Sequence, residues 1–112
     1  MRPEVRKAAK EAHIAAGAPF AQWQRNPFLA LTMYVELIDE FGWDALKRVF
    51  AEYRDLPANE RPRNDNEKRD QWMWRFSKTV GKNLGPFFDQ WGVPVSQGAK
   101  DLVADLPVWL PE

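Results

Sequence analysis

The chain has 112 residues, no cysteine, one histidine and a formal net charge of zero. A domain of this size buries roughly two thirds of the surface that its unfolded chain exposes, and a hydrophobic content of 45% supplies material for one core. The absence of cysteine excludes disulfides, thiolate zinc sites and thiol nucleophiles, and the zero net charge removes the simplest electrostatic argument for a nucleic-acid or anionic-membrane partner.

The first predicted element is a helix over residues 4–16. Pro3 occupies a favourable first position, the run is rich in Ala, Lys, Arg and Glu, and Gly17 follows it. Its apolar stripe is thin, so we expect this helix at the periphery of the domain. His13 is expected on its exposed surface.

Two antiparallel helices are expected next. Asn26 as N-cap and Pro27 in the first turn begin an amphipathic helix that ends at Gly42. A left-handed cap at Gly42 is expected to reverse the chain, and Trp43 begins a second helix that ends before Pro57.

The second half of the chain predicts a loop, three helices and a docked tail. Residues 57–66 are polar and rich in proline, which is typical of an exposed connection. The three helices are delimited by caps or by Gly and Pro, and they run from Asp65 or Asn66 to Gly81, from Gly85 to Gly92, and from Ser96 to Pro107. The tail is too apolar to stay in water, so Trp109 is expected to dock on the bundle.

The predicted fold is therefore all-α, a compact bundle of five or six helices joined by short Pro/Gly loops. It forms a single domain over residues 1–112, with a peripheral first helix in 1–18 and the main part in 26–111. The expected core consists of large apolar residues at helical spacing: Phe28, Leu31, Val35, Ile38, Phe41, Leu46, Val49, Phe50, Trp72, Phe76, Val80, Phe88 and Trp91. No apolar run approaches the ~20 residues that span a bilayer, so no membrane span is expected.

Acidic residues gather along one edge of the second predicted helix. Glu36, Asp39 and Glu40 suggest a cation site or paired acid and base catalysts. Hard cations need ligands that converge from a rigid loop or from several elements, and none accompany this group. We therefore favour a solvated helix face.

Aromatic residues suggest two kinds of ligand. Trp72 and Trp74 lie among basic residues between positions 54 and 82, but interspersed acids oppose a nucleic-acid patch, so no nucleic-acid partner is expected. Trp74 lies off the apolar stripe and is a candidate exposed contact residue. The pairs of Trp43 and Trp91 with neighbouring glycines suggest a sugar-stacking shelf, although we expect these rings to seal the ends of the bundle.

Five motifs in a fixed order resemble a known family. They are Tyr34-x-x-Leu37-Ile38-x-x-Phe41-Gly42-Trp43, Phe50-x-x-Tyr53, Trp72-x-x-x-Phe76-Ser77, Asn83-Leu84-x-Pro86-Phe87-Phe88-x-x-Trp91-Gly92-x-Pro94-Val95-Ser96 and Leu106-Pro107-x-Trp109-x-Pro111. Together they resemble the C-terminal helical part of the enhancin-like, mucin-directed zinc metallopeptidases (peptidase family M-sixty), over about residues 27–111. The structural motif residues by this resemblance are Tyr34, Phe41, Gly42, Trp43, Phe76, Asn83, Pro86, Phe87, Phe88, Trp91, Gly92 and Trp109.

The resemblance implies a parent protein in which His-Glu-x-x-His and a later Glu hold zinc and which cleaves glycoproteins such as mucins. This chain lacks that motif, and one histidine cannot supply two imidazole ligands. No catalytic or metal-binding residue is therefore assigned here, zinc is expected only in the parent catalytic domain, and hydrolysis by this chain alone is not expected. The resemblance also implies a secreted or cell-surface parent.

Two functions follow from these observations. The resemblance predicts a non-catalytic C-terminal subdomain that supports the cleft of a glycoprotein-directed zinc peptidase, with the upstream catalytic domain of the same polypeptide as its partner. The alternative is a stand-alone helical interaction module that binds a protein or a glycan through exposed aromatic residues.

Overall fold

The computed structural model describes residues 2–111, and this part of the chain contains seven α-helices. They are α1 (Pro3–Ala15), α2 (Phe20–Arg25), α3 (Pro27–Phe41), α4 (Trp43–Arg54), α5 (Asp65–Val80), α6 (Gly85–Trp91) and α7 (Gln97–Leu102), with a 3-10 turn at Ala58–Glu60. The predicted all-α class is confirmed. The two end residues of the predicted 1–112 domain lie outside the described part.

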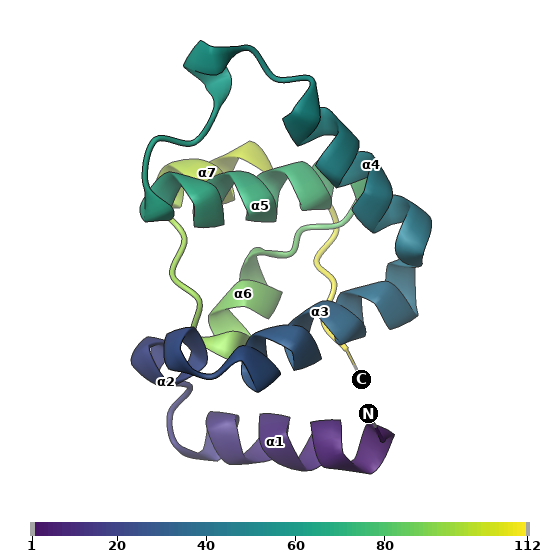
Figure 1. The fold of residues 1–112 in the computed structure, drawn as a ribbon, viewed down its shortest axis with the longest axis vertical. Helices are drawn as coiled ribbons and strands as arrows, with labels where there is room; N and C mark the ends of the chain where they lie inside the picture. Colours follow the sequence, from purple (N-terminus) through teal and green to yellow (C-terminus); the bar gives the residue numbers. More distant parts are fainter. Residues whose placement is uncertain (1, 112) are drawn as a thin grey trace.

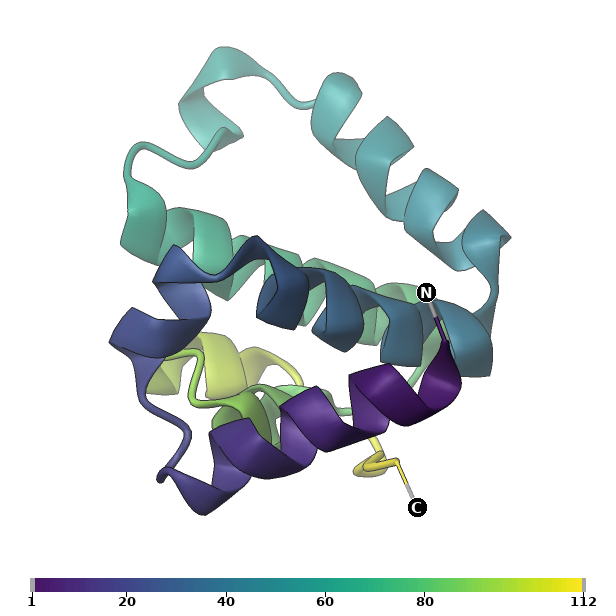
Figure 2. The ribbon, with the colours of Figure 1, turned by 60° about the horizontal axis from the view of Figure 1, so that its bottom comes forward.

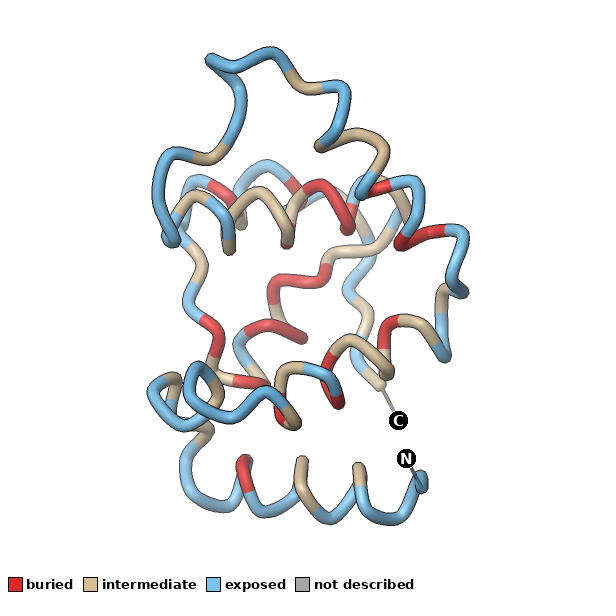
Figure 3. The backbone as a smooth tube through the Cα atoms, viewed as in Figure 1, coloured by how far each residue is buried: buried red, intermediate tan, exposed pale blue. Residues whose placement is uncertain are grey.

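The helices pack in layers around α6 (Figure 1). Helix α1 lies along α3, α6 lies between α3 and α5 in Figure 1, and α7 packs on α5. Figure 2 shows the molecule with α1 in front. Helix α4 leaves the end of α3 and packs on α5. Four of the seven residues of α6 are buried, so the buried part of the backbone is concentrated at the centre of the molecule (Figure 3).

Local signals place most helix ends correctly. The Asn26 side chain accepts a hydrogen bond from the Phe28 amide at 3.0 Å, and Ser96 Oγ accepts one from the Ala99 amide at 3.2 Å. Helix α5 is capped one residue earlier than predicted, because Asn64 Oδ1 accepts from the Glu67 amide at 2.9 Å. Side-chain oxygens at these positions satisfy backbone donors that the first helical turn leaves unpaired.

Helix α2 is not among the predicted elements. It has only six residues, which is too short for a hydrophobic period to be visible in the sequence. Isolated helices of this length are unstable in water, so tertiary contacts must hold it in place. Helix α2 packs on α3, and its Trp23 side chain packs against the core.

The buried face of α3 is rotated from the predicted one. The structure buries Leu29, Met33 and Leu37, which are spaced by four residues, whereas the predicted core residue Leu31 is 47% exposed. A shift of one residue corresponds to about 100° around a helix. Helix α3 is apolar on most of its surface and contacts α1, α2 and α4, so the sequence pattern alone does not define its orientation.

The other predicted core residues divide into three classes. Those that are buried are Leu46, Val49, Phe76, Phe88 and Trp91, and those that are half-buried are Phe28, Val35, Ile38, Phe41, Trp72 and Val80. The prediction is wrong for Phe50 as well as for Leu31, since Phe50 is 56% exposed.

The first helix is attached through residues that were expected on the surface. His13 is 1% exposed, and its Nε2 atom lies 2.8 Å from the Trp91 carbonyl oxygen. Glu36 is also not solvated as predicted: its side chain accepts hydrogen bonds from Lys10 Nζ at 2.7 Å and from the Trp91 indole at 3.1 Å. A buried imidazole and a partly buried carboxylate need such partners, and the packing of α1, α3 and α6 supplies them.

The tail docks on the bundle, as its apolar content predicts. The Asn83 amide donates to the Pro107 carbonyl at 2.8 Å, and the Trp109 amide donates to the Asn83 carbonyl at 3.2 Å. The Trp109 ring lies 5.0 Å from Phe41 and 5.2 Å from Phe87, centroid to centroid. These contacts hold residues 107–109 against the link between α5 and α6.

Candidate functional site

Two adjoining cavities lie where α3, α4 and α5 meet. The larger has a volume of about 270 Å³ and the smaller about 160 Å³, and both are lined by Tyr34 and Trp72. We call the two cavities together the aromatic cleft. Its aromatic lining residues are Trp23, Tyr34, Phe50, Tyr53, Trp72 and Phe88.

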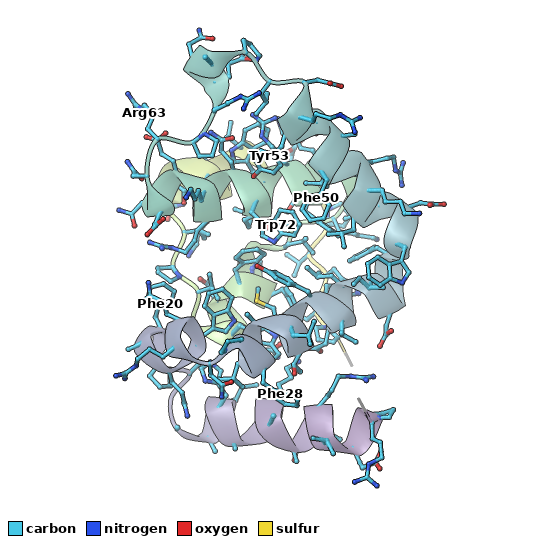
Figure 4. All side chains as sticks on the ribbon, viewed as in Figure 1. Phe20, Phe28, Phe50, Tyr53, Arg63 and Trp72 are labelled. Carbon is cyan, nitrogen blue, oxygen red and sulfur yellow. The ribbon has the colours of Figure 1, made fainter. Side chains whose placement is uncertain are left out.

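Trp72 is the central ring of the aromatic cleft. Phe50 from α4 stacks on it with the centroids 5.6 Å apart, and Tyr34 from α3 meets it edge-on at 5.8 Å. Phe76, one turn further along α5, contacts it from the core side at 5.5 Å. Phe50 and Trp72 lie side by side in Figure 4. The exposed ring of Phe50 is therefore held by a packed neighbour, which reduces the conformational entropy that binding would cost.

The polar groups of the cleft walls are mainly hydrogen-bond donors. Lys68 and Arg69 line the larger cavity, and no carboxylate lines either cavity. The indole N–H groups of Trp23 and Trp72 are buried and have no hydrogen-bond partner. Burial raises the pKa of Tyr53 to about 12, with nearby Arg75 acting in the opposite direction.

The outer face of α4 continues the aromatic surface. Trp43, Lys47, Phe50 and Arg54 follow each other at spacings of four, three and four residues, so they share one helix face, and all four are exposed. The expectation that Trp43 seals an end of the bundle is wrong, because its side chain is 62% exposed. Gly42 has φ 86° and ψ 162°, which is not the predicted left-handed helical cap.

The structure separates the residues that the sequence singled out. Trp74 is half-buried and does not line the cleft; the Arg75 guanidinium lies 4.3 Å from its ring centroid. Among the motif residues, the buried ones are Phe76, Phe87, Phe88 and Trp91, the half-buried ones are Tyr34, Phe41, Asn83, Pro86, Gly92 and Trp109, and the exposed ones are Gly42 and Trp43. Of these, Tyr34 and Phe88 line the cleft.

Phe50, Tyr53 and Trp72 were not identified as a surface by sequence reasoning, which placed Phe50 and Trp72 in the core. One available signal was the alternation of aromatic and basic residues on a single face of α4. A helix face that packs on the core rarely carries charged side chains, whereas every second residue of this stripe is Lys or Arg.

The described residues do not fit the zinc that the family resemblance implies for the parent protein. Residues 2–111 contain no group of three His, Asp or Glu side chains placed to hold a metal ion. The single histidine is buried, and its two ring nitrogens lie within hydrogen-bond distance of Trp91 and Gln22. Over the same residues, no helix is both long and apolar enough to cross a membrane.

Comparison with curated proteins identifies relatives that match 97% of the chain. Mouse TRPM8 channel-associated factor 3 is 38% identical over 109 residues, and human TRPM8 channel-associated factor 2 is 37% identical over 109 residues. A homologue of these factors from Xenopus laevis is 33% identical over 110 residues. The chain spans only 11–12% of the length of these relatives.

These relatives overturn the main functional prediction. They match almost the whole chain, and their names describe association with a channel rather than cleavage of glycoproteins. The prediction of a supporting subdomain in a glycoprotein-directed zinc peptidase is therefore wrong. So is the predicted pairing with an upstream catalytic domain and a mucin-like substrate. The alternative, an interaction module that uses exposed aromatic residues, agrees better with these relatives.

A solved structure shares the fold. A functionally unknown conserved protein from Bacillus anthracis superposes with a TM-score of 0.78 at 32% identity, over 92% of this chain and 22% of that protein. The model of the family "Peptidase M60, enhancin and enhancin-like" matches residues 1–92, which is most of the chain. The resemblance expected from the aromatic, glycine and proline motifs is thus confirmed. The chain belongs to the peptidase M60, enhancin and enhancin-like family.

Proposed function

We propose that this chain is a helical protein-interaction module and that the aromatic cleft is its contact surface. The observation that carries the proposal is the position of Phe50, which is 56% exposed and yet stacked on Trp72. Large aromatic side chains beside apolar cavities are the usual energetic centres of protein interfaces. An exposed aromatic ring that adjoins apolar cavities is typical of an interaction site.

The names of the curated relatives support a binding role. They are called channel-associated factors, which describes association with another protein. Because the chain spans about an eighth of their length, that particular partner is not transferred to it. What supports the proposal here is the exposed aromatic surface itself.

A protein partner fits the cleft better than a glycan. Sugars stack on the open face of a tryptophan ring. In the cleft, Phe50 stacks on the Trp72 face with an interplanar angle of 27°, and Tyr34 closes one edge. The rings therefore present a ridge with adjoining hollows, which suits a protruding apolar side chain of a protein.

The proposal is tested by selecting peptides from a random library displayed on phage against the immobilised chain. We expect enriched peptides that bind the wild-type chain and lose binding to the Phe50→Ala variant. Leu102→Ala is the matched control, because Leu102 is an exposed apolar residue on α7 that does not line the cleft. Enriched peptides that bind both variants equally, or no enrichment, would overturn the proposal.

A further inference from the structure

We propose that the partner of the aromatic cleft is an acidic amphipathic protein segment, with a large apolar side chain that enters the cleft and carboxylates on either side of it. This inference rests on the proposed function of the cleft and adds the chemistry of its occupant. It is carried by two independent features of the cleft walls and rim: the charge of the lining residues and the exposed cations of α4.

The charged lining residues are all cationic. Lys68 and Arg69 line the larger cavity together with Pro62, and neither cavity has an Asp or Glu in its lining. Lys68 Nζ lies 3.6 Å from Asp65, but both side chains are mostly exposed, so this pair is weak and easily exchanged for another carboxylate.

Arg69 is a fixed charge at the same wall. Its Nε donates to the Pro94 carbonyl at 3.1 Å, and the guanidinium lies 4.8 Å from the Phe20 ring centroid. Neither contact neutralises the positive charge. An incoming carboxylate therefore meets a positioned cation rather than a mobile one, and less side-chain entropy is lost on binding.

The α4 side of the rim is also cationic. Lys47 and Arg54 lie on the same exposed helix face as Phe50, one turn before it and one turn after it. Lys47 forms no ion pair within the described residues, and the nearest carboxylate to Arg54 is that of its exposed neighbour Asp55, at 3.8 Å. The exposed ring of Phe50 thus has an available cation on each side along α4.

A basic segment fits this surface less well. Lys and Arg side chains are hydrogen-bond donors only, and they would meet the like charge of Lys68 and Arg69.

Single-stranded nucleic acid is the competing anionic occupant, and the observations favour it less. Bases stack on open aromatic faces, but Phe50 covers the Trp72 face. Nucleic acid is therefore an outcome that the experiment must be able to detect.

The phage selection described above supplies the first test. Among peptides that require Phe50, we expect enrichment of Asp and Glu within a few residues of a Trp, Phe or Leu. The best such peptide is then synthesised with a fluorescein label, and its binding to the chain is measured by fluorescence anisotropy. The companion peptides replace every carboxylate with the amide, or the central apolar residue with Ser.

The charge of the rim is tested with single variants. Lys68→Ser and Lys47→Ser are each expected to weaken binding about two- to fivefold, the range of an exposed ion pair. Lys7→Ser is the matched control, because Lys7 is an exposed cation on α1 outside the cleft lining, and it should leave affinity unchanged. Raising the salt concentration from about 0.05 to about 0.5 M should weaken wild-type binding and reduce the difference between these variants.

The possible results separate the two proposals. Acidic peptides that depend on both Phe50 and Lys68 support both. Peptides that depend on Phe50 but are neutral or basic overturn the acidic partner and leave the interaction module in place. The acidic partner is also overturned if Lys68→Ser behaves like Lys7→Ser, or if labelled oligothymidylate binds the chain and displaces the peptide. Absence of any peptide that depends on Phe50 overturns the function of the cleft.

Discussion

His13 in α1 is joined to Trp91 in α6 across 78 positions of the chain, with Nε2 of the imidazole 2.8 Å from the tryptophan carbonyl oxygen. The two rings also stack, with centroids 5.7 Å apart. A carbonyl at the last turn of a helix has no partner within the helix. The imidazole supplies one and thereby attaches the first helix to the centre of the fold.

Replacement of His13 with Ala should destabilise the domain by about 2–4 kcal/mol, because it leaves a cavity and an unpaired carbonyl. Urea unfolding followed by circular dichroism measures the change. Lys7→Ala, an exposed position on the same helix, is expected to stay within about 0.5 kcal/mol of the wild type. Equal stability of the two variants would contradict the anchoring role of the histidine.

Gly92 should not tolerate a side chain. A Cβ atom at this position would lie 1.8 Å from the Ala18 carbonyl oxygen, and φ is 74°. We expect Gly92→Ala to cost about 3–5 kcal/mol, combining backbone strain with displacement of the segment that joins α1 to α2.

The matched control for this steric effect is Gly81→Ala. Gly81 also has positive φ, 71°, but a Cβ there would meet nothing within 4 Å. Its cost should be the strain alone, about 1–2 kcal/mol. Thermal unfolding of the two variants side by side separates the two causes, and similar melting temperatures would argue against the close approach.

The core and the cleft should respond differently to loss of an aromatic ring. Phe76→Ala removes a fully buried ring and should cost about 3–5 kcal/mol of unfolding free energy. Phe50→Ala removes a ring that is 56% exposed and should cost at most about 1.5 kcal/mol. Leu31→Ala, at a position that the sequence assigned to the core, should cost less than about 1 kcal/mol. Chemical denaturation tests the order, and a Phe50 variant as unstable as the Phe76 variant would place that ring in the core.

Stability should fall at strongly alkaline pH through Tyr53. Burial raises the pKa of its phenol from 10.0 to about 12, so the folded state prefers the neutral form. The unfolded chain loses this proton first, and the contribution is therefore intact below pH 10 and lost progressively as pH rises to about 12. Absorbance of tyrosinate at alkaline pH, compared between wild type and Tyr53→Phe, reports the titration. A phenol that titrates at its ordinary pKa would contradict the burial of this side chain.

The parts of the fold that depend on neighbouring residues were predictable. Asn26 and Ser96 cap their helices through bonds to amides two or three positions away, and Gly81 ends α5 in the left-handed conformation. Such interactions are complete within one helical turn, so the sequence contains all their determinants. Helix type and most helix ends follow from them.

The parts of the fold that depend on distant residues could not be predicted from the sequence. His13 looks like a surface residue in an alanine-rich helix until α6 brings the Trp91 carbonyl to it. The rotation of α3 depends on which of its apolar sides α1, α2 and α4 cover. The aromatic cleft is lined by residues of five helices, α2 to α6, so Phe50 and Trp72 could be recognised as apolar from the sequence but not as a surface.

The docked tail determines which aromatic rings are accessible to solvent. Trp109 covers Phe41 and Phe87, and the backbone bonds to Asn83 fasten it there. The cluster around Trp72 has no such cover within residues 2–111, and Phe50 remains exposed. Residues 107–109 thus shield one group of aromatic rings, whereas the Phe50 ring stays in contact with solvent.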